Sequence, residues 1–296
     1  MTTTDTPLQY LAERTVVVIV TDIGYFPRAE TTIRDIRGRG KWNHDLVVIS
    51  VGFELPQEFK DLYMIQEKKF EQIDLTRLFE KLGSRGFDDT DHREFNKKTQ
   101  WEKLHVFDIW FSQWERVIYF DAGFRIVDRV DFLLERDSQG VIIAPNDAGF
   151  PNGDRGPKTD SRFRRLVYPK AELDTMIQLY EEFGKTEAEP DFMDAEYFCN
   201  CIWIYDTAIL SYNPTLIGDI KSYMIEVANR FPLWVSNEMG VMNAVLNVKM
   251  GVWREMESRN LANKYMYAWT ETTLKSHTTS WQDYCYIKYA SSLLFS

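Results

Sequence analysis

The sequence predicts an α/β protein with a mostly parallel β-sheet flanked by helices. Short runs of apolar, mostly β-branched residues, such as TVVVIVT at Thr15–Thr21, are typical of strands buried on both faces of such a sheet. These runs alternate with segments whose apolar residues recur at helical spacing. No clear linker divides the 296 residues, so we expect one compact domain over 1–296.

The expected elements follow from these two periodicities along the chain. Strands are expected at Thr15–Thr21, Asp45–Val51, Leu62–Ile65, Val117–Asp121, Val141–Pro145 and Cys199–Tyr205. Helices are expected at Arg28–Arg37, Leu75–Leu82, Asn96–Trp114, Lys170–Lys185, Thr215–Arg230 and Glu238–Asn247. Gly38 supplies a stop signal for the first helix. Residues 146–169 are rich in glycine, proline and arginine, which indicates a surface insertion.

The composition excludes several classes of protein. With 35 basic and 45 acidic residues the net charge is −10, which disfavours binding to the phosphates of nucleic acids. The longest apolar runs, such as Val16–Val20, are far shorter than the roughly twenty residues of a membrane span. The polar start Met1–Asp5 does not resemble a signal peptide. The three cysteines favour a reducing compartment, so we expect a cytoplasmic protein.

A carboxylate ends one of the expected strands. Asp121 follows the apolar run 117–120 and precedes Ala122 and Gly123. Ligands of open α/β sheets bind at the carboxyl ends of the strands, and carboxylate oxygens suit a hard cation that also takes diphosphate oxygens. An aspartate that only starts a turn is the structural alternative, and position alone does not decide between the two.

Two other segments point to a bound nucleotide. Lys103 lies in the expected Asn96–Trp114 helix, where it could neutralise a departing phosphate, although a solvated lysine is the ordinary interpretation. Asp22 and Tyr25 follow the first strand, where nucleotide-binding α/β folds commonly hold the nucleotide. The chain has neither a G-x-G-x-x-G motif nor a P-loop, so no dinucleotide or Walker-type phosphate site is indicated.

Three further features invite a metal-site interpretation. His277 lies in a polar, threonine-rich segment and is a candidate metal ligand, with a purely structural histidine as the alternative. The segment Asp88–His92 contains a literal Asp-x-Asp that ends at Asp91, but no apolar strand precedes it, so we expect a solvated loop or a mobile lid there. Cys199 and Cys201 lie in an apolar strand, which makes a core position for one of them more plausible than a metal site.

Taken in order, these segments resemble the glycogenin-like members of glycosyltransferase family 8, which have the GT-A fold. The most specific part runs from Lys103-Leu-His105 through Asp121-Ala-Gly123 to Phe132-Leu133. Val18–Tyr25, Ala144–Asn146, Phe198–Tyr205, Glu238–Asn243 and His277 also match in order. The resemblance extends from about residue 15 to about residue 285 and is weak between these segments.

The resemblance implies a Rossmann-like GT-A domain that transfers a sugar from a UDP-sugar to a carbohydrate or protein acceptor, with a Mn²⁺-type metal and retention of the anomeric configuration. It implies a nucleotide-binding half at 15–150 and an acceptor-binding half at 151–296. A homodimer is possible for such a protein. Neither a nucleic acid nor a membrane span belongs to this expectation.

The resemblance also implies roles for single residues. The donor would contact Val20, Asp22, Tyr25, Lys103, Asp121 and Ala122. Asp121 and His277 would bind the metal. Lys103 would steady the diphosphate, and Asn200 and Glu238 would face the sugar. A carboxylate such as Glu238 can stabilise an oxocarbenium-like centre, by analogy with glycoside hydrolysis.

The sequence departs from the family pattern at points that matter for chemistry. Gly123 replaces the second metal-binding aspartate, so metal binding is expected to be weak or absent. Ile202 stands where the family has a glycine, and Met239 where it has a glutamine. Two alternatives therefore stay open. One is a GT-A-fold binding protein without turnover. The other is a nucleotidyltransferase, although the glycine-rich basic loop of that class is missing.

Overall fold

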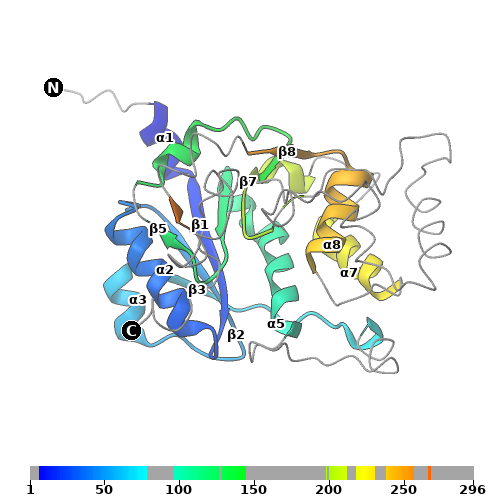
Figure 1. The fold of residues 1–296 in the computed structure, drawn as a ribbon, viewed down its shortest axis with the longest axis horizontal. Coiled ribbons are helices and arrows are strands. Elements are labelled where there is room, and N and C mark those ends of the chain that lie inside the picture. The colour runs from blue at the N-terminus through cyan, green and yellow to red at the C-terminus, as the bar shows by residue number, and fades with distance from the viewer. Residues whose placement is uncertain are drawn as a thin grey trace, which may run out of the picture.

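The computed structural model describes residues 7–78, 97–126, 129–144, 198, 200–211, 218–230, 238–256 and 266–267. Their strands form a mixed sheet in the order β3-β2-β1-β4-β7-β6-β8, with helices on both faces (Figure 1). The strands are β1 (Thr15–Asp22), β2 (Leu46–Val51), β3 (Gln66–Lys68), β4 (Arg116–Phe120), β6 (Ile142–Ala144), β7 (Ile202–Asp206) and β8 (Trp253–Glu255). A separate pair joins β5 (Arg125–Ile126) to β9 (Met266–Tyr267).

The helices of these segments are short. The α-helices are α1 (Pro7–Glu13), α2 (Phe26–Gly38), α3 (Gln57–Tyr63), α5 (Lys97–Trp101), α7 (Ile220–Arg230) and α8 (Glu238–Met242). The 3₁₀ helices are η1 (Glu102–Phe107), η2 (Ile109–Gln113), η3 (Asp131–Glu135) and η7 (Thr207–Ser211), and η9 (Asn243–Lys249) is a π-helix that continues α8. Among the residues described, no helix has the length and apolarity that a bilayer crossing demands.

The strand pairing confirms the mostly parallel sheet. β1 runs parallel to β2 and β4, β2 is parallel to β3, and β6 is parallel to β8. β7 lies antiparallel between β4 and β6. The carboxyl ends of β1 and β4 therefore meet the amino end of β7 at one edge, where the Asp121 amide donates to the Cys201 carbonyl at 2.8 Å. Polar side chains from three strand ends can gather at this edge.

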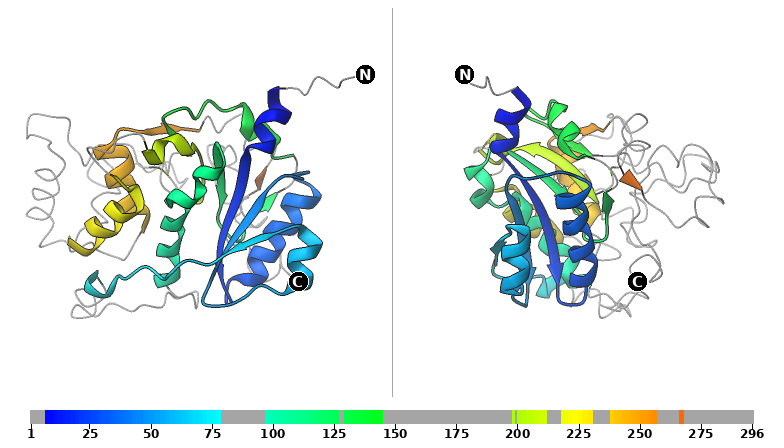
Figure 2. Two further views of the ribbon diagram at one scale, coloured as in Figure 1. Left: turned by 180° about the vertical axis from the view of Figure 1, so that it is seen from behind. Right: turned by 90° about the vertical axis from the view of Figure 1, so that its left-hand side faces the viewer.

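Alternating residues of the strands point to opposite faces of the sheet and pack into two apolar layers, one on each face. Val16 and Val18 of β1 face the layer covered by α5, η1, α7 and α8, whereas Val17 and Ile19 face the layer covered by α2 and α3. Figures 1 and 2 show these helix groups on opposite sides of the sheet. Because helices cover both faces of the sheet, the central strands are apolar at nearly every position. Such continuous apolar runs allowed these strands to be predicted from the sequence.

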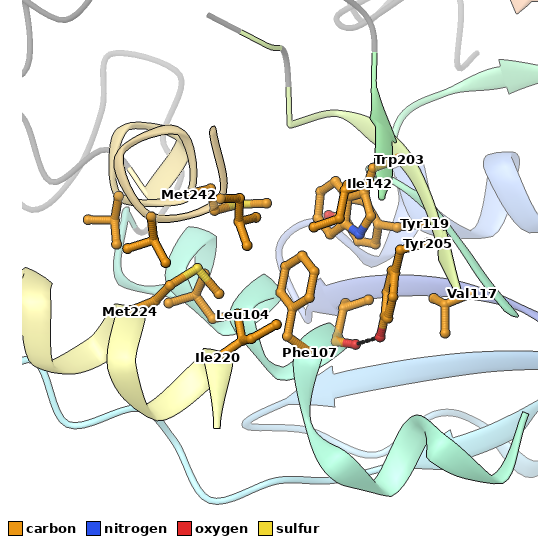
Figure 3. Packing of buried hydrophobic residues seen from close by; sticks show 14 of the residues in the cluster. Leu104, Phe107, Val117, Tyr119, Ile142, Trp203, Tyr205, Ile220, Met224 and Met242 are labelled. Atoms are coloured by element: carbon orange, nitrogen blue, oxygen red, sulfur yellow. Dashed lines mark hydrogen bonds between the residues drawn. The ribbon is translucent and has the colours of Figure 1, made fainter. Parts of the chain in front are cut away.

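Aromatic packing fixes η1 on the sheet. The Phe107 ring stacks on the Trp203 ring of β7 with centroids 5.7 Å apart, and Trp203 stacks on Tyr119 of β4 at 3.8 Å (Figure 3). The Tyr205 hydroxyl donates to the Val106 carbonyl. Burial raises the pKa of Tyr205 well above its usual value, so the hydroxyl keeps the proton that it donates. These contacts position the segment that also contains Lys103.

The prediction of one long helix over Asn96–Trp114 is wrong. The segment is broken into α5, η1 and η2, and the second break lies at Asp108, whose backbone is extended (φ −70°, ψ 142°). The Asp108 carboxylate accepts a hydrogen bond from the Trp110 amide at 2.9 Å and forms an ion pair with Lys221 of α7. An aspartate that bonds nearby backbone in this way competes with helix continuation, although the apolar spacing runs on through it.

The predicted strand at Leu62–Ile65 is also wrong. Helix α3 runs to Tyr63, and Met64 ends it in the left-handed conformation (φ 49°, ψ 56°). The strand begins only at Gln66, because the chain first has to leave the helix and turn beside β2.

Other predicted bounds shift at their first residues. β7 begins at Ile202 instead of Cys199, and α7 begins at Ile220 instead of Thr215. The start of α7 follows from Asp219, whose carboxylate accepts from the Ser222 amide at 3.2 Å, as in an N-cap. Residues 76–78 are helical, within the predicted helix at 75–82. The predicted insertion 146–169 and the helix 170–185 lie outside the described residues.

We expect Asp108→Ala to lower the free energy of unfolding by about 2 kcal/mol, because it removes a helix cap and a half-buried ion pair together. Burial alone would raise the pKa of Asp108, but the hydrogen bonds from Lys221 and the Trp110 amide outweigh it and hold the pKa below its usual value. The stabilisation is therefore present at neutral pH and lost as the pH falls through the folded-state pKa.

The measurement is urea unfolding of the wild type and Asp108→Ala between about pH 6 and about pH 3. The difference between the two proteins should narrow toward the acidic end. Asp137→Ala is the control, because Asp137 is exposed and accepts a local hydrogen bond from the Gln139 amide. An equal cost of Asp108→Ala at both ends of the pH range would contradict the ion pair.

Candidate active site

Four of the predicted site residues meet at the edge formed by β4 and β7. Lys103 comes from η1, Asp121 directly follows β4, Asn200 precedes β7, and Glu238 is the first residue of α8. The Lys103 Nζ lies 3.0 Å from Asp121 Oδ1 and 2.9 Å from Glu238 Oε1. Asn200 Nδ2 donates to the same Glu238 oxygen at 2.9 Å. One ammonium group therefore joins two carboxylates from distant parts of the sequence.

This cluster is almost wholly enclosed by protein. Lys103 is 6% exposed, Asp121 8%, Glu238 4% and Asn200 1%. Charged groups are this deeply buried only when they are paired, because removing a single charge from water costs several kcal/mol. Lys103 is thus no solvated surface lysine, whereas Lys98, in the preceding helix α5, is exposed.

Lys103 is directed inward because all of η1 is buried. Two neighbours of Lys103 along the helix pair with each other: His105 Nε2 lies 2.8 Å from Glu102 Oε2, and the other Glu102 oxygen accepts from the Ile73 amide at 3.1 Å. His105 Nδ1 is buried and has no hydrogen-bond partner among the described residues. The lysine is then left to face the end of β4. Three ionisable residues, Glu102, Lys103 and His105, are therefore buried in one short helix, each with an ionisable partner.

Tyr119 is a member of the cluster that sequence reasoning missed. Its hydroxyl donates to Asp121 Oδ1 at 2.6 Å, and its ring lies 5.9 Å from Lys103 Nζ. The signal was present in the sequence, since residues two apart in a strand share a face. Tyr119 and Lys103 together hold one oxygen of Asp121 and fix its orientation.

Glu238 presents an open acceptor. Its Oε1 forms an ion pair with Lys103 and accepts a hydrogen bond from Asn200. Its Oε2 is buried and has no hydrogen-bond partner in the described part of the chain. With both carboxyls ionised, the charges of Lys103, Asp121 and Glu238 leave one net negative charge. An unsatisfied buried carboxylate oxygen is costly, so this atom is suited to accept a hydrogen bond from a ligand hydroxyl.

The residues predicted to hold the nucleoside lie at the same edge, after β1. Asp22 Oδ1 accepts from the Tyr25 amide at 2.8 Å, which shapes the turn into α2. Val20 is buried near the end of β1, and Ala122 is buried in the turn that follows β4. The observed hydrogen bond gives Asp22 a local role in the turn, and its contact with a nucleoside stays a prediction.

The loop after β4 is fastened to α2. Gly123 has φ +102°, and its amide donates to Thr32 Oγ1 at 2.9 Å. The same hydroxyl lies 2.9 Å from the Phe124 carbonyl and 3.1 Å from the Arg28 carbonyl of its own helix, and it can donate its one proton to either. Because Thr32 satisfies two backbone groups of a buried loop, it determines where the loop that begins at Asp121 sits.

The described residues do not fit the divalent metal that the resemblance implies. His277 lies outside them, and within them no group of three or more His, Cys, Asp or Glu side chains is placed to hold an ion. Asp121 Oδ1 already accepts from Lys103 and Tyr119, and Gly123 has no side chain to offer. Within the described residues, the ammonium of Lys103 is the positive charge that contacts both carboxylates.

The other residues considered as metal ligands are the two neighbouring cysteines and the acidic segment near residue 90. Cys201 is fully buried in the apolar layer beside α2, as expected for one cysteine of its pair. Cys199, Asp88 and Asp91 lie outside the described residues.

Comparison with known sequences gives no match, either to a protein-family profile or to a curated protein. Solved structures do match. The galactosyltransferase LgtC, solved in complex with donor and acceptor sugar analogues, is 12% identical, with a TM-score of 0.52 over 91% of this chain and 83% of that chain. The chain has the GT-A fold of glycosyltransferases.

Two other solved structures agree with this fold. The mannosyltransferase Ktr4p from S. cerevisiae is 10% identical, with a TM-score of 0.51 over 85% of this chain and 70% of that chain. The bifunctional glycosyltransferase WbbM, in its apo form, is 13% identical, with a TM-score of 0.52 over 83% of this chain. The present chain spans 39% of that bifunctional protein. At identities this low, the similarity to these structures shows a shared fold and nothing more.

We expect Thr32→Val to lower the free energy of unfolding by about 2 kcal/mol, because it leaves the Gly123 amide and the Phe124 carbonyl buried without their partner. Thr31→Val is the matched control, since within the described residues the Thr31 hydroxyl donates to the Pro27 carbonyl of its own helix and to no loop. Chemical unfolding of both variants measures the difference. Equal effects of the two substitutions would show that Thr32 does not hold the loop.

Proposed function

We propose that the protein is a glycosyltransferase that moves a sugar from a nucleotide-sugar, with a UDP-sugar as the expected donor, to a carbohydrate or protein acceptor. The observation that supports this most is the buried Lys103–Asp121–Glu238 cluster with its open acceptor oxygen at the strand edge. A donor at this edge is supported by the general rule that ligands of open α/β sheets bind at the carboxyl ends of the strands. LgtC, which has a similar fold, was solved in complex with donor and acceptor sugar analogues.

Lys103 is proposed to act on the leaving group. In the transfer, the bond between the anomeric carbon and the diphosphate oxygen breaks, and negative charge grows on the departing nucleoside diphosphate. A preorganised ammonium in a site that excludes water stabilises such charge far better than water does. Asp121 and Glu238 hold Lys103 in place before the donor arrives.

Glu238 is proposed to face the reacting sugar. Asn200 and Lys103 bind Oε1 and so fix the carboxyl group with Oε2 unsatisfied. That oxygen can accept from a sugar hydroxyl and stabilise positive charge on an oxocarbenium-like anomeric carbon. With retention, the acceptor oxygen bonds to the anomeric carbon from the side that the diphosphate leaves, and the acceptor proton passes to the diphosphate oxygen.

The nucleoside is proposed to lie over the loop after β1, where it would contact Asp22, Tyr25 and the chain at Val20 and Ala122. In this arrangement 15–150 is the nucleotide-binding half, and the acceptor binds to 151–296. A Mn²⁺ held by Asp121 and His277 stays an implication of the family resemblance. No step of the proposed reaction runs through it.

We expect Lys103→Met to reduce hydrolysis or transfer of UDP-sugars by at least about 100-fold, because it removes the charge that stabilises the leaving group. Lys98→Met is the matched control, since Lys98 is an exposed lysine of the same segment. The measurement is UDP release from UDP-glucose, UDP-galactose and UDP-xylose. Equal loss in both variants, or no loss in Lys103→Met, would contradict the assignment.

We expect Glu238→Gln to lower turnover by about 100-fold while donor affinity changes by less than about tenfold, because the amide keeps the shape but not the charge. UDP-sugar binding by calorimetry, measured beside the rate, separates the two effects. Donor binding with no turnover in the wild type would instead support the binding-protein function that Gly123 motivates. Absence of both would overturn the proposal.

A further inference from the structure

The loop that follows β4 has a backbone suited to glycine at the position where the resembling family has an acidic metal ligand. Gly123 has φ +102°, a conformation that residues with a side chain rarely adopt. Its amide is held there by Thr32 at 2.9 Å. An aspartate at this position would strain the loop, so the missing carboxylate is part of the loop's shape.

Arg28 occupies the space beside this glycine. A Cβ atom on Gly123 would lie 3.8 Å from Arg28 Cδ and 3.9 Å from Arg28 Cβ. The guanidinium carbon lies 5.3 Å from the centroid of the Tyr25 ring. The arginine thus runs along the loop that begins at Asp121, and its charged end stacks on the residue that is predicted to contact the nucleoside.

Charge balance shows what this arginine can do. The ammonium of Lys103 already serves both Asp121 and Glu238, and a bound diphosphate adds at least two more negative charges. Arg125, after the same loop, is bonded to Asp35 at 2.6 Å. Among the described residues, Arg28 is the cationic side chain that a Cβ atom built on Gly123 would meet.

We infer that Arg28 binds the diphosphate of the donor and supplies the positive charge that a metal held by a second aspartate supplies in the resembling family. This inference rests on the proposed function. A planar guanidinium can bind two phosphate oxygens at once, and stacking on Tyr25 limits the entropy that it loses. Donor binding by this chain therefore does not require a divalent metal.

The test is calorimetric binding of UDP and of uridine in EDTA and again in Mn²⁺. The wild type should bind UDP in EDTA with an affinity close to that in Mn²⁺. Arg28→Gln should weaken UDP binding by 10- to 100-fold, the value of a charge-assisted hydrogen-bond pair, and leave uridine binding unchanged. Arg28→Lys should restore part of the lost UDP affinity, because lysine keeps the positive charge but lacks the paired N–H donors of the guanidinium.

Arg34→Gln is the matched control. Arg34 is an exposed arginine on the same helix and forms an ion pair with Glu30 one turn away. Its replacement should leave UDP binding unchanged, and thermal unfolding of each variant checks that the fold is retained.

Three results would overturn the inference. UDP binding by Arg28→Gln as tight as by the wild type would show that Arg28 does not contact the diphosphate. Binding of UDP by the wild type only in Mn²⁺ would show that a metal ion, and not Arg28, neutralises the diphosphate. If the wild type binds none of UDP, GDP and CDP in either buffer, the proposed function fails and the inference fails with it.

Discussion

The ammonium group of Lys103 is the contact on which the proposed site depends. It lies within 3.0 Å of Asp121 and 2.9 Å of Glu238, so it joins η1, the end of β4 and the start of α8. None of these three charges would be stable in this environment alone. The site can therefore form only when all three elements are in place.

The surrounding structure keeps that contact in place. Phe107 and Trp203 stack η1 on the sheet, and the Asp108–Lys221 ion pair ties the end of η1 to α7. On the other side, Thr32 fixes the loop after Asp121 to α2. The two apolar layers of the sheet thus meet at one edge through polar contacts. A small displacement of either layer would separate the lysine from a carboxylate.

Much of the fold is predictable from the sequence because strands buried on both faces must be apolar at almost every position. Val16–Val20 and Val117–Phe120 show this, and the carboxylate after the second run marks the edge of the sheet. The break at Asp108 was not predictable from periodicity, since the apolar spacing continues through it. Only the bond to the Trp110 amide reveals why the helix stops.

The site itself was predictable in part. The resemblance named Lys103, Asp121, Asn200 and Glu238, and the structure brings these four together. The sequence could not show that Lys103 is buried, because a lysine at a helical position looks the same whether it faces solvent or a carboxylate. The sequence also offered no reason to consider Arg28, for which a role at the diphosphate is proposed above. Its position matters only once the Gly123 loop is known to lie against α2.

The most direct test of this account is a double-mutant cycle between Lys103 and Glu238. Unfolding free energies are measured for the wild type, Lys103→Met, Glu238→Gln and the double variant. The account predicts that the two single substitutions together lower the free energy of unfolding by more than the double substitution does. The difference, which is the coupling energy of the pair, should be at least about 1.5 kcal/mol, as for a buried ion pair. Losses that add within about 0.5 kcal/mol would show that the two charges do not meet in the folded protein and would contradict the account.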